Sequence, residues 1–175
     1  MLGQPSNQML AQAEQGIQSK LPPAMQQDLQ KVLHAGMTIL YSPQLQGQLQ
    51  QRIKTSTDPV KDASEGAARL VSNLYQQSNK TMPTALIVPA AMIFAFEYLD
   101  LVQKAGRAQI TPQMIAQTTT AVGDTVLPLF GMTKDKLAAL IAHAKQNPQG
   151  APQSAPQATP QAAPTGILGS AQGAQ

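Results

Sequence analysis

One long apolar run near the middle of the chain restricts the folds open to this sequence. The run TALIVPAAMIFAFEYLDLV occupies residues 84–102, and no charged residue occurs between Lys80 and Glu97. A helix that is apolar on nearly every side is either buried on every side or faces lipid. Pro89 lies inside the run, so we expect a kink there. We judge the run too short and too interrupted for a conventional transmembrane span, which needs about 20 apolar residues. The sequence therefore predicts a central helix enclosed by weaker amphipathic helices.

Amphipathic segments on both sides of the run extend this prediction to the whole chain. Apolar residues recur three or four positions apart, as expected for helices with one buried face. The predicted fold class is all-α: a multi-helix bundle of about six or seven short amphipathic helices around one apolar helix, with an extended C-terminal tail. The domain boundaries expected are a helical domain over residues 1–146 and the tail over 147–175. The predicted helices begin near residues 7, 24, 43, 59, 84, 112 and 133.

Local signals place several helix ends. Proline follows a capping residue at Ser42, Asp58 and Thr111, which is typical of a first helical turn. Gly106 is expected to end the central helix, and three consecutive threonines at 118–120, which are poor helix formers, leave room for a break in a later one.

Three further details concern side-chain pairs and close packing. The spacing of Glu65 with Arg69, and of Asp100 with Lys104, predicts two ion pairs within helices. Gly36 lies on the apolar face of its helix, so we expect another helix to approach closely there.

The composition favours contact with proteins over contact with nucleic acid. Charged residues make up only 12% of the chain, and glutamine is abundant. A polar but uncharged surface suits packing against copies of the same chain, because little charge has to be desolvated. We therefore expect a homo-oligomer. The net charge of +3 is spread thinly, so no sequence-specific nucleic-acid binding is expected.

No pattern in the sequence indicates catalysis. The two histidines, His34 and His143, lack the spacing of a metal site, and there is no cysteine. Glu97 and Asp100 are three residues apart, but no partner cluster accompanies them, so we interpret them as solvated acids and not as a catalytic pair. The sequence predicts no enzyme, no cofactor and no metal. The N-terminus also lacks the pattern of a secretory signal.

The last 29 residues form a loose, uncharged APQ repeat. Such a segment buries too little apolar surface to offset its ordering entropy, so we expect it to be extended. Ile167 and Leu168 form a short apolar group within it, and a tethered group of this kind can dock on a partner at high effective concentration.

A second apolar stretch, over residues 122–132, raises the question of what covers the apolar surface. Both stretches can pack together as a core, and we favour this arrangement for a domain of this size. In an oligomer they would instead form a belt that faces lipid or other subunits. The candidate residues for interface or membrane contact are Leu86, Val88, Met92, Ile93, Phe94, Phe96, Val126, Leu127, Leu129 and Phe130.

Taken together, three segments resemble a known family. The apolar TALIVPAAMIFAFEYLDLV run, the glutamine-rich QLQGQLQQRIK helix and the APQ tail ending in GILGSAQGAQ resemble the small internal, or ejection, virion proteins of short-tailed bacteriophages of the T7-like and N4-like types. The resemblance is one of style across the chain and transfers no functional residue.

The resemblance implies a virion protein stored in the capsid that leaves through the tail at infection. Such a protein would oligomerise with other virion proteins and contact the host envelope, helping to form a conduit for DNA. One alternative is a static head or tail protein, an adaptor or decoration protein, whose C-terminal tail clamps a neighbouring subunit. Another is a helical adaptor or chaperone for a secretion partner. The expected location is the virion, and for the ejection type also the host cell envelope during infection.

Overall fold

The computed structural model describes residues 5–136, 138, 139 and 142, and every regular element in that part of the chain is helical. The predicted all-α class is therefore confirmed. The elements in order are α1 (Gln8–Ser19), α2 (Pro23–Leu40), α3 (Pro43–Thr55), α4 (Pro59–Gln77), the short 3-10 helix η1 (Thr84–Leu86), α5 (Ile87–Lys104) and α6 (Pro112–Leu129).

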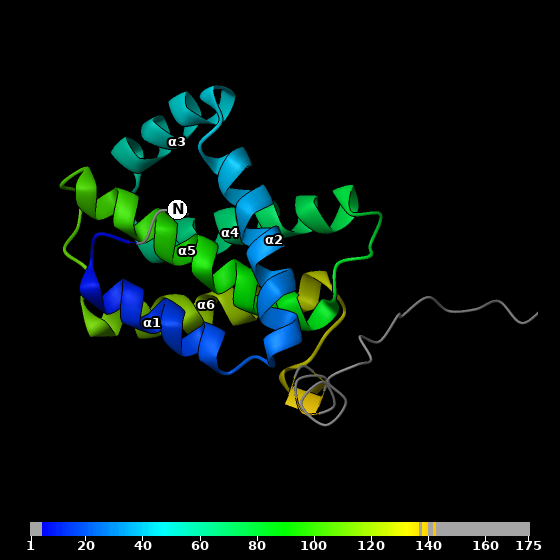
Figure 1. Cartoon of the computed structure of the whole chain (residues 1–175). Coiled ribbons are helices and arrows are strands. Elements are labelled where there is room, and N and C mark those ends of the chain that lie inside the picture. Colours follow the sequence, from blue (N-terminus) through cyan, green and yellow to red (C-terminus); the bar gives the residue numbers. More distant parts are fainter. Residues whose placement is uncertain (1–4, 137, 140–141, 143–175) are drawn as a thin grey trace, which may run out of the picture.

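Helix α5 lies at the centre of the bundle, as the apolar run predicted. Helices α1, α2, α4 and α6 all pack against it, and α4 and α6 also pack against each other (Figure 1). Fourteen residues of α5 are buried, so this helix supplies much of a single continuous core. Helix α3 lies at the edge of the bundle.

Proline and glycine place the helix ends as expected. Helices α2, α3, α4 and α6 each begin with proline, whose missing N–H is not needed in a first turn. After α5, Gly106 adopts a φ of +67°. Its N–H donates to the Gln103 carbonyl at 2.8 Å, and the Arg107 N–H donates to the Val102 carbonyl at 3.1 Å. These two bonds form a Schellman cap, which confirms the predicted end of the central helix.

Three local predictions were wrong. Pro89 is the third residue of α5, directly after η1, so it lies in a first helical turn, where proline is tolerated, and not in the helix interior, where a proline would kink the helix. Together η1 and α5 span 21 residues, Thr84–Lys104, so the segment is not too short to cross a bilayer. The threonines at 118–120 do not interrupt α6, because tertiary packing outweighs their poor helix propensity. The hydroxyls of Thr119 and Thr120 donate to carbonyls one turn earlier.

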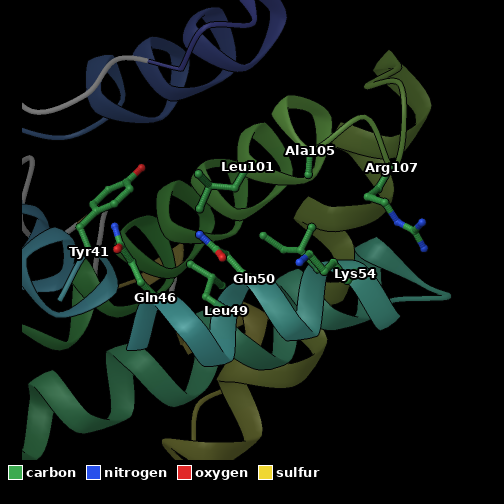
Figure 2. A pocket seen from close by; sticks show the side chains of 9 residues that line it. Tyr41, Gln46, Leu49, Gln50, Lys54, Leu101, Ala105 and Arg107 are labelled. Carbon is green, nitrogen blue, oxygen red and sulfur yellow. The ribbon is translucent and has the colours of Figure 1, made fainter. Parts of the chain in front are cut away.

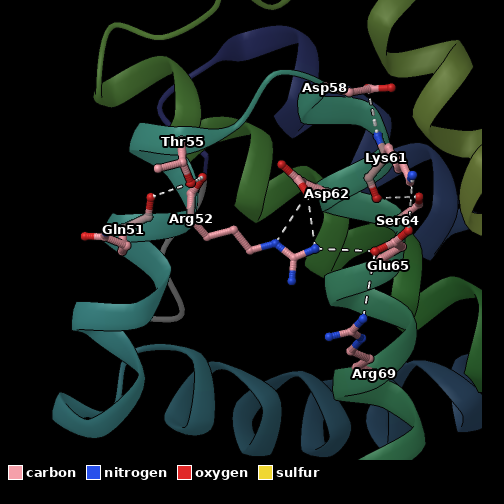
Figure 3. A network of polar contacts seen from close by, with 9 residues as sticks. All are labelled: Gln51, Arg52, Thr55, Asp58, Lys61, Asp62, Ser64, Glu65 and Arg69. Atoms are coloured by element: carbon pink, nitrogen blue, oxygen red, sulfur yellow. Dashed lines mark hydrogen bonds and ion pairs between the residues drawn. The ribbon is translucent and has the colours of Figure 1, made fainter.

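Helix α3 is attached to α4 mainly by charge. The Arg52 guanidinium donates to Asp62 at 3.1 Å and reaches Glu65 at 3.5 Å, and Glu65 also pairs with Arg69 at 3.9 Å, as predicted (Figure 3). The only buried residue of α3 is Ile53. A narrow apolar contact and a half-exposed ion network hold this helix, so it is the least firmly packed of helices α1 to α6.

The predicted last helix lies only partly within the described residues. The Lys136 N–H donates to the Thr133 hydroxyl at 3.3 Å, in agreement with the predicted cap, and the described residues that follow Thr133 are helical. The predicted tail over 147–175, with Ile167 and Leu168, and the histidine at position 143 lie outside the described residues.

Candidate functional site

The most distinctive feature of the molecule is a membrane-length apolar helix that its own chain encloses. The segment Thr84–Lys104 is long and apolar enough to cross a bilayer, and 89% of its most apolar 18-residue window is buried. Helical proteins without any membrane role also have central helices of this kind. What distinguishes this helix is the group of buried carboxyl side chains and their hydrogen bonds near its C-terminal end.

The structure places most of the predicted contact residues inside the bundle. Leu129 is an exception, because it is 61% exposed at the end of α6. Met92 and Phe130 are half-buried, and the Phe130 ring packs edge-on against Tyr75 at a centroid distance of 5.2 Å. In the single chain, lipid or a second copy can reach the buried residues of α5 only if the bundle opens. The fully buried members of the set are Leu86, Val88, Ile93, Phe94, Phe96, Val126 and Leu127.

Helix α1 covers α5 incompletely. A hollow of about 460 Å³ lies between α1, α5 and α6, with Gly16 and Ile17 on one side and Met92 and Ile115 on the others. A Cβ added at Gly16 would meet nothing within 4 Å. Missing contacts of this kind weaken a packed interface, because each lining atom loses its dispersion partners. The hollow therefore lowers the cost of moving α1 away from α5.

Polar contacts attach the start of α1 to the end of α5. The Ser6 N–H and hydroxyl both donate to Asp100 Oδ1, at 3.1 and 2.8 Å, and the Asn7 N–H donates to the same oxygen at 3.3 Å. The Asn7 side chain donates to Gln103 Oε1 at 2.7 Å. Lys104 Nζ lies 2.6 Å from Asp100 Oδ2. Burial opposes ionisation of Asp100, but the bonds from Lys104 and Ser6 prevail and hold its pKa below the usual value.

Two further carboxyl groups are buried beside Asp100. Glu97, on α5, accepts a hydrogen bond from the Tyr41 hydroxyl at 3.2 Å. Glu14, on α1, is 8% exposed, and its Oε1 has no hydrogen-bond partner. Burial, and then the charges of Glu97 and Asp100, raise the pKa of Glu14 to about 8. Burial also raises the pKa of Glu97, although the bond from Tyr41 works against this shift.

The interpretation of Glu97 and Asp100 as solvated acids was therefore wrong. They are 3% and 0% exposed, because α1 and α2 pack over the end of α5 that carries them. Their burial could not be deduced from spacing along α5 alone, since it depends on which helices cover that end.

Sequence reasoning missed Glu14 altogether. It placed the apolar stripe of the first helix on Met9, Ala13, Ile17 and Leu21. Leu21 is buried as expected, but Leu10 and Glu14 are buried in place of Met9, which is 36% exposed. The residues 10, 14, 17 and 21 follow helical spacing equally well, and this spacing was the available signal.

This arrangement is suited to holding or releasing α1, since protonation of Glu14 changes the attraction between α1 and α5. With Glu14 protonated, α1 brings no additional charge to Glu97 and Asp100. With Glu14 ionised, a buried charge without a hydrogen-bond partner at Oε1 lies near Glu97 and Asp100, and both its desolvation and its repulsion by negative charge there oppose the closed bundle. Within the described residues, no group of histidine or acidic side chains could hold a metal ion.

The closed surface also carries a separate groove between α3 and α5, lined by Leu49, Ile53 and Leu101 (Figure 2). It does not contain the buried acids. Comparison of the chain with protein-family models, curated proteins and solved structures gave no match.

Proposed function

We propose that this chain is an internal virion protein of the ejection type, stored as a closed bundle and opened during infection. In the open form, several copies assemble through their apolar helices and contribute to a conduit for DNA across the host envelope. The observation that carries the proposal is the 21-residue apolar segment Thr84–Lys104, enclosed by helices of the same chain.

The length of this segment supports a role in a bilayer. Twenty-one helical residues extend about 30 Å, which is close to the thickness of the hydrocarbon core. Asp100 and Lys104 lie in the last two turns, so they would lie near one interface, where charged groups cost far less than at the bilayer centre. Glu97 lies within one turn of the middle of the segment, so in a bilayer it would be protonated or face the interior of the assembly.

The covering helices support release. Helix α3 has one buried residue, and α1 packs beside a hollow of about 460 Å³ and carries a buried, unpartnered carboxyl group. There is no cysteine, so no disulfide has to be reduced before the bundle opens. A chain that must pass through a narrow tail needs such weak internal attachments.

The resemblance to ejection proteins of short-tailed bacteriophages supplies the biological setting. The glutamine-rich, weakly charged composition is compatible with close packing of copies. The virion location and the envelope contact belong to the same proposal.

The completeness of the core favours a second candidate function. The apolar residues of α5 are buried within the single chain, so the bundle needs no partner to be stable. This observation supports a static head or tail protein that binds a neighbouring subunit through residues 147–175. The two candidates differ in whether α5 ever leaves the bundle.

Dye release from vesicles tests the proposal. Vesicles of phosphatidylglycerol and phosphatidylethanolamine are mixed with wild-type protein and with Met92→Lys. Met92 is half-buried, so a lysine reaches solvent in the closed bundle. In a bilayer-spanning α5 the same lysine lies near the middle of the span and costs about 3 kcal/mol. We expect wild-type protein to release dye and the variant to release at least five-fold less.

Thr119→Lys is the matched control. Thr119 lines the same hollow but belongs to α6, so its substitution leaves α5 unchanged. We expect dye release equal to that of wild type, and circular dichroism should show that all three proteins remain helical. If the wild-type protein neither binds vesicles nor releases dye, the ejection function is wrong and the static role is favoured.

A further inference from the structure

We propose that the groove between α3 and α5 binds a free fatty acid, with the carboxylate at Lys54 and Arg107 and the acyl chain along Leu49, Ile53 and Leu101. This site is present on the closed bundle and does not require α5 to leave it. It is separate from the buried acids, and its existence does not depend on the proposed function.

The size of the groove suits a small amphiphile. Its volume is about 410 Å³, within the range of pockets that hold small molecules and too small to enclose several turns of a helix. The apolar wall comes from two elements, because Leu49 and Ile53 lie on α3 and Leu101 and Ala105 lie at the end of α5.

The two ends of the groove differ in charge. In Figure 2, Tyr41 lies at one end, and Lys54, Ala105 and Arg107 lie at the other. The Tyr41 hydroxyl already donates its proton to Glu97, so it offers no hydrogen bond to an anion at this end. Neither Lys54 nor Arg107 forms an ion pair with another described residue, and no acidic residue lines this groove. An anion is therefore attracted to one end only.

The helix dipoles reduce this attraction without cancelling it. Both α3 and α5 end close to the cationic end, and each helix C-terminus carries about half a negative charge. Two full positive charges exceed the two half charges. Lys104, in the last turn of α5, is already paired with Asp100 and adds little.

The backbone of the walls favours an acyl chain over a peptide. Both walls are helices whose N–H and C=O groups are bonded within the helix, so an extended peptide would find no backbone partners there. An acyl chain needs none, and its burial is favourable in proportion to its apolar area. Gln46 and Gln50, further along α3, leave the groove open to water on that side, as suits a ligand with one polar end.

The test is an amide chemical-shift titration of the full chain with laurate below its micelle concentration. The comparison ligand is dodecyltrimethylammonium, which has the same chain length and the opposite charge. We expect laurate to perturb the amides of α3 and the end of α5, and to bind about ten-fold more tightly than the cation. Two exposed ion pairs are worth about this much.

Charge and shape are then changed separately. Lys54→Gln combined with Arg107→Gln should weaken laurate binding about ten-fold and should not weaken binding of the cation, because it removes two charges that repel it. Lys31→Gln combined with Lys61→Gln, at exposed sites on other helices, is the charge-matched control and should change the binding of neither ligand.

Ala105→Phe should weaken the binding of both ligands by filling the groove, whereas Ala116→Phe, at an exposed position on α6, should weaken the binding of neither.

Three outcomes would overturn the site. The first is equal affinity for laurate and the cation. The second is a set of shifts centred on Met92 and Ile115, in the other hollow. The third is binding to phosphatidylglycerol vesicles without binding to laurate, which would indicate a membrane surface instead of a fatty acid.

Discussion

Gly36 on α2 lies directly against the ring of Phe94 on α5. A Cβ at Gly36 would overlap the Phe94 ring, whereas a Cβ at Gly16, Gly47, Gly66 or Gly123 would meet nothing within 4 Å. The predicted close approach at Gly36 is therefore confirmed. Phe94 is 2% exposed, so a shift of its ring changes contacts within the core.

Gly36→Ala should destabilise the bundle even though alanine is the better helix former. The gain in propensity is about 1 kcal/mol, and forcing the ring aside costs about 1–3 kcal/mol. We expect a lower free energy of unfolding in urea. Gly47→Ala is the matched control and should stabilise by about 0.5–1 kcal/mol. Combining Gly36→Ala with Phe94→Leu should recover part of the loss, and strict additivity would contradict the contact.

Glu14 should make the bundle less stable at alkaline pH. Its folded pKa of about 8 lies above the unfolded value of 4.5, so the folded state binds the proton more tightly. The stabilisation is complete below about pH 4.5 and is lost as the pH rises through 8. We expect the free energy of unfolding to fall by roughly 2 kcal/mol or more between pH 5 and pH 9.

Glu14→Gln should flatten this dependence, because the amide keeps the shape without the ionisation. Some dependence of the free energy of unfolding on pH should remain, since burial also raises the pKa of Glu97. Tyr41 contributes little in this range, because burial and Glu97 raise its pKa to about 12. Asp28→Asn, at a surface ion pair, should leave the slope unchanged. A wild-type profile already flat from pH 5 to pH 9 would show that Glu14 is not buried as described.

Asp100→Asn should destabilise the protein at neutral pH. Asp100 accepts three bonds from Ser6 and Asn7 and pairs with Lys104, and its side chain is 1% exposed. Hydrogen bonds to a charged group are worth about 1.5–3 kcal/mol, so we expect a loss of about 2 kcal/mol in urea unfolding at pH 7.

The acid dependence of this variant checks the origin of the loss. The folded pKa of Asp100 is below its usual value of 3.8, so its stabilisation is present above pH 3.8 and is lost as the pH falls through the folded pKa. The difference from wild type should therefore shrink below pH 3. Asp124→Asn is the control, because that side chain is 59% exposed, and it should cost less than about 0.5 kcal/mol.

Arg52→Gln should loosen α3 without unfolding the bundle. Arg52 links α3 to Asp62 and Glu65 on α4, and these pairs are partly exposed (Figure 3). We expect a global cost below about 1 kcal/mol, but faster amide hydrogen exchange throughout α3, with α5 unchanged. Lys31→Gln removes a comparable surface pair and should leave α3 exchange as it was. Unchanged α3 exchange in Arg52→Gln would mean that Ile53 alone anchors the helix.

Local chemistry allowed much of the fold to be predicted from the sequence. The apolar run from 84 to 102 predicted a central helix, because a helix that is apolar on nearly every side has to be covered on every side. The prolines at 43, 59 and 112 and the glycine at 106 placed helix ends, since their backbone preferences act within a few residues.

The candidate site depended on contacts between distant segments. Asp100 is bonded to Ser6, 94 residues away. The pKa of Glu14 is raised because packing of α1 buries this side chain and, to a smaller extent, because it brings the side chain near Glu97 and Asp100. Helical spacing did not choose between the Met9 and Leu10 faces of α1, and only packing on α5 decided which face was buried. The sequence by itself determined which helices form and which helix lies at the centre, because propensity and apolar content are properties of short segments. The tertiary structure decided which acids are buried and what they bond to, because burial and electrostatic coupling depend on how remote segments meet.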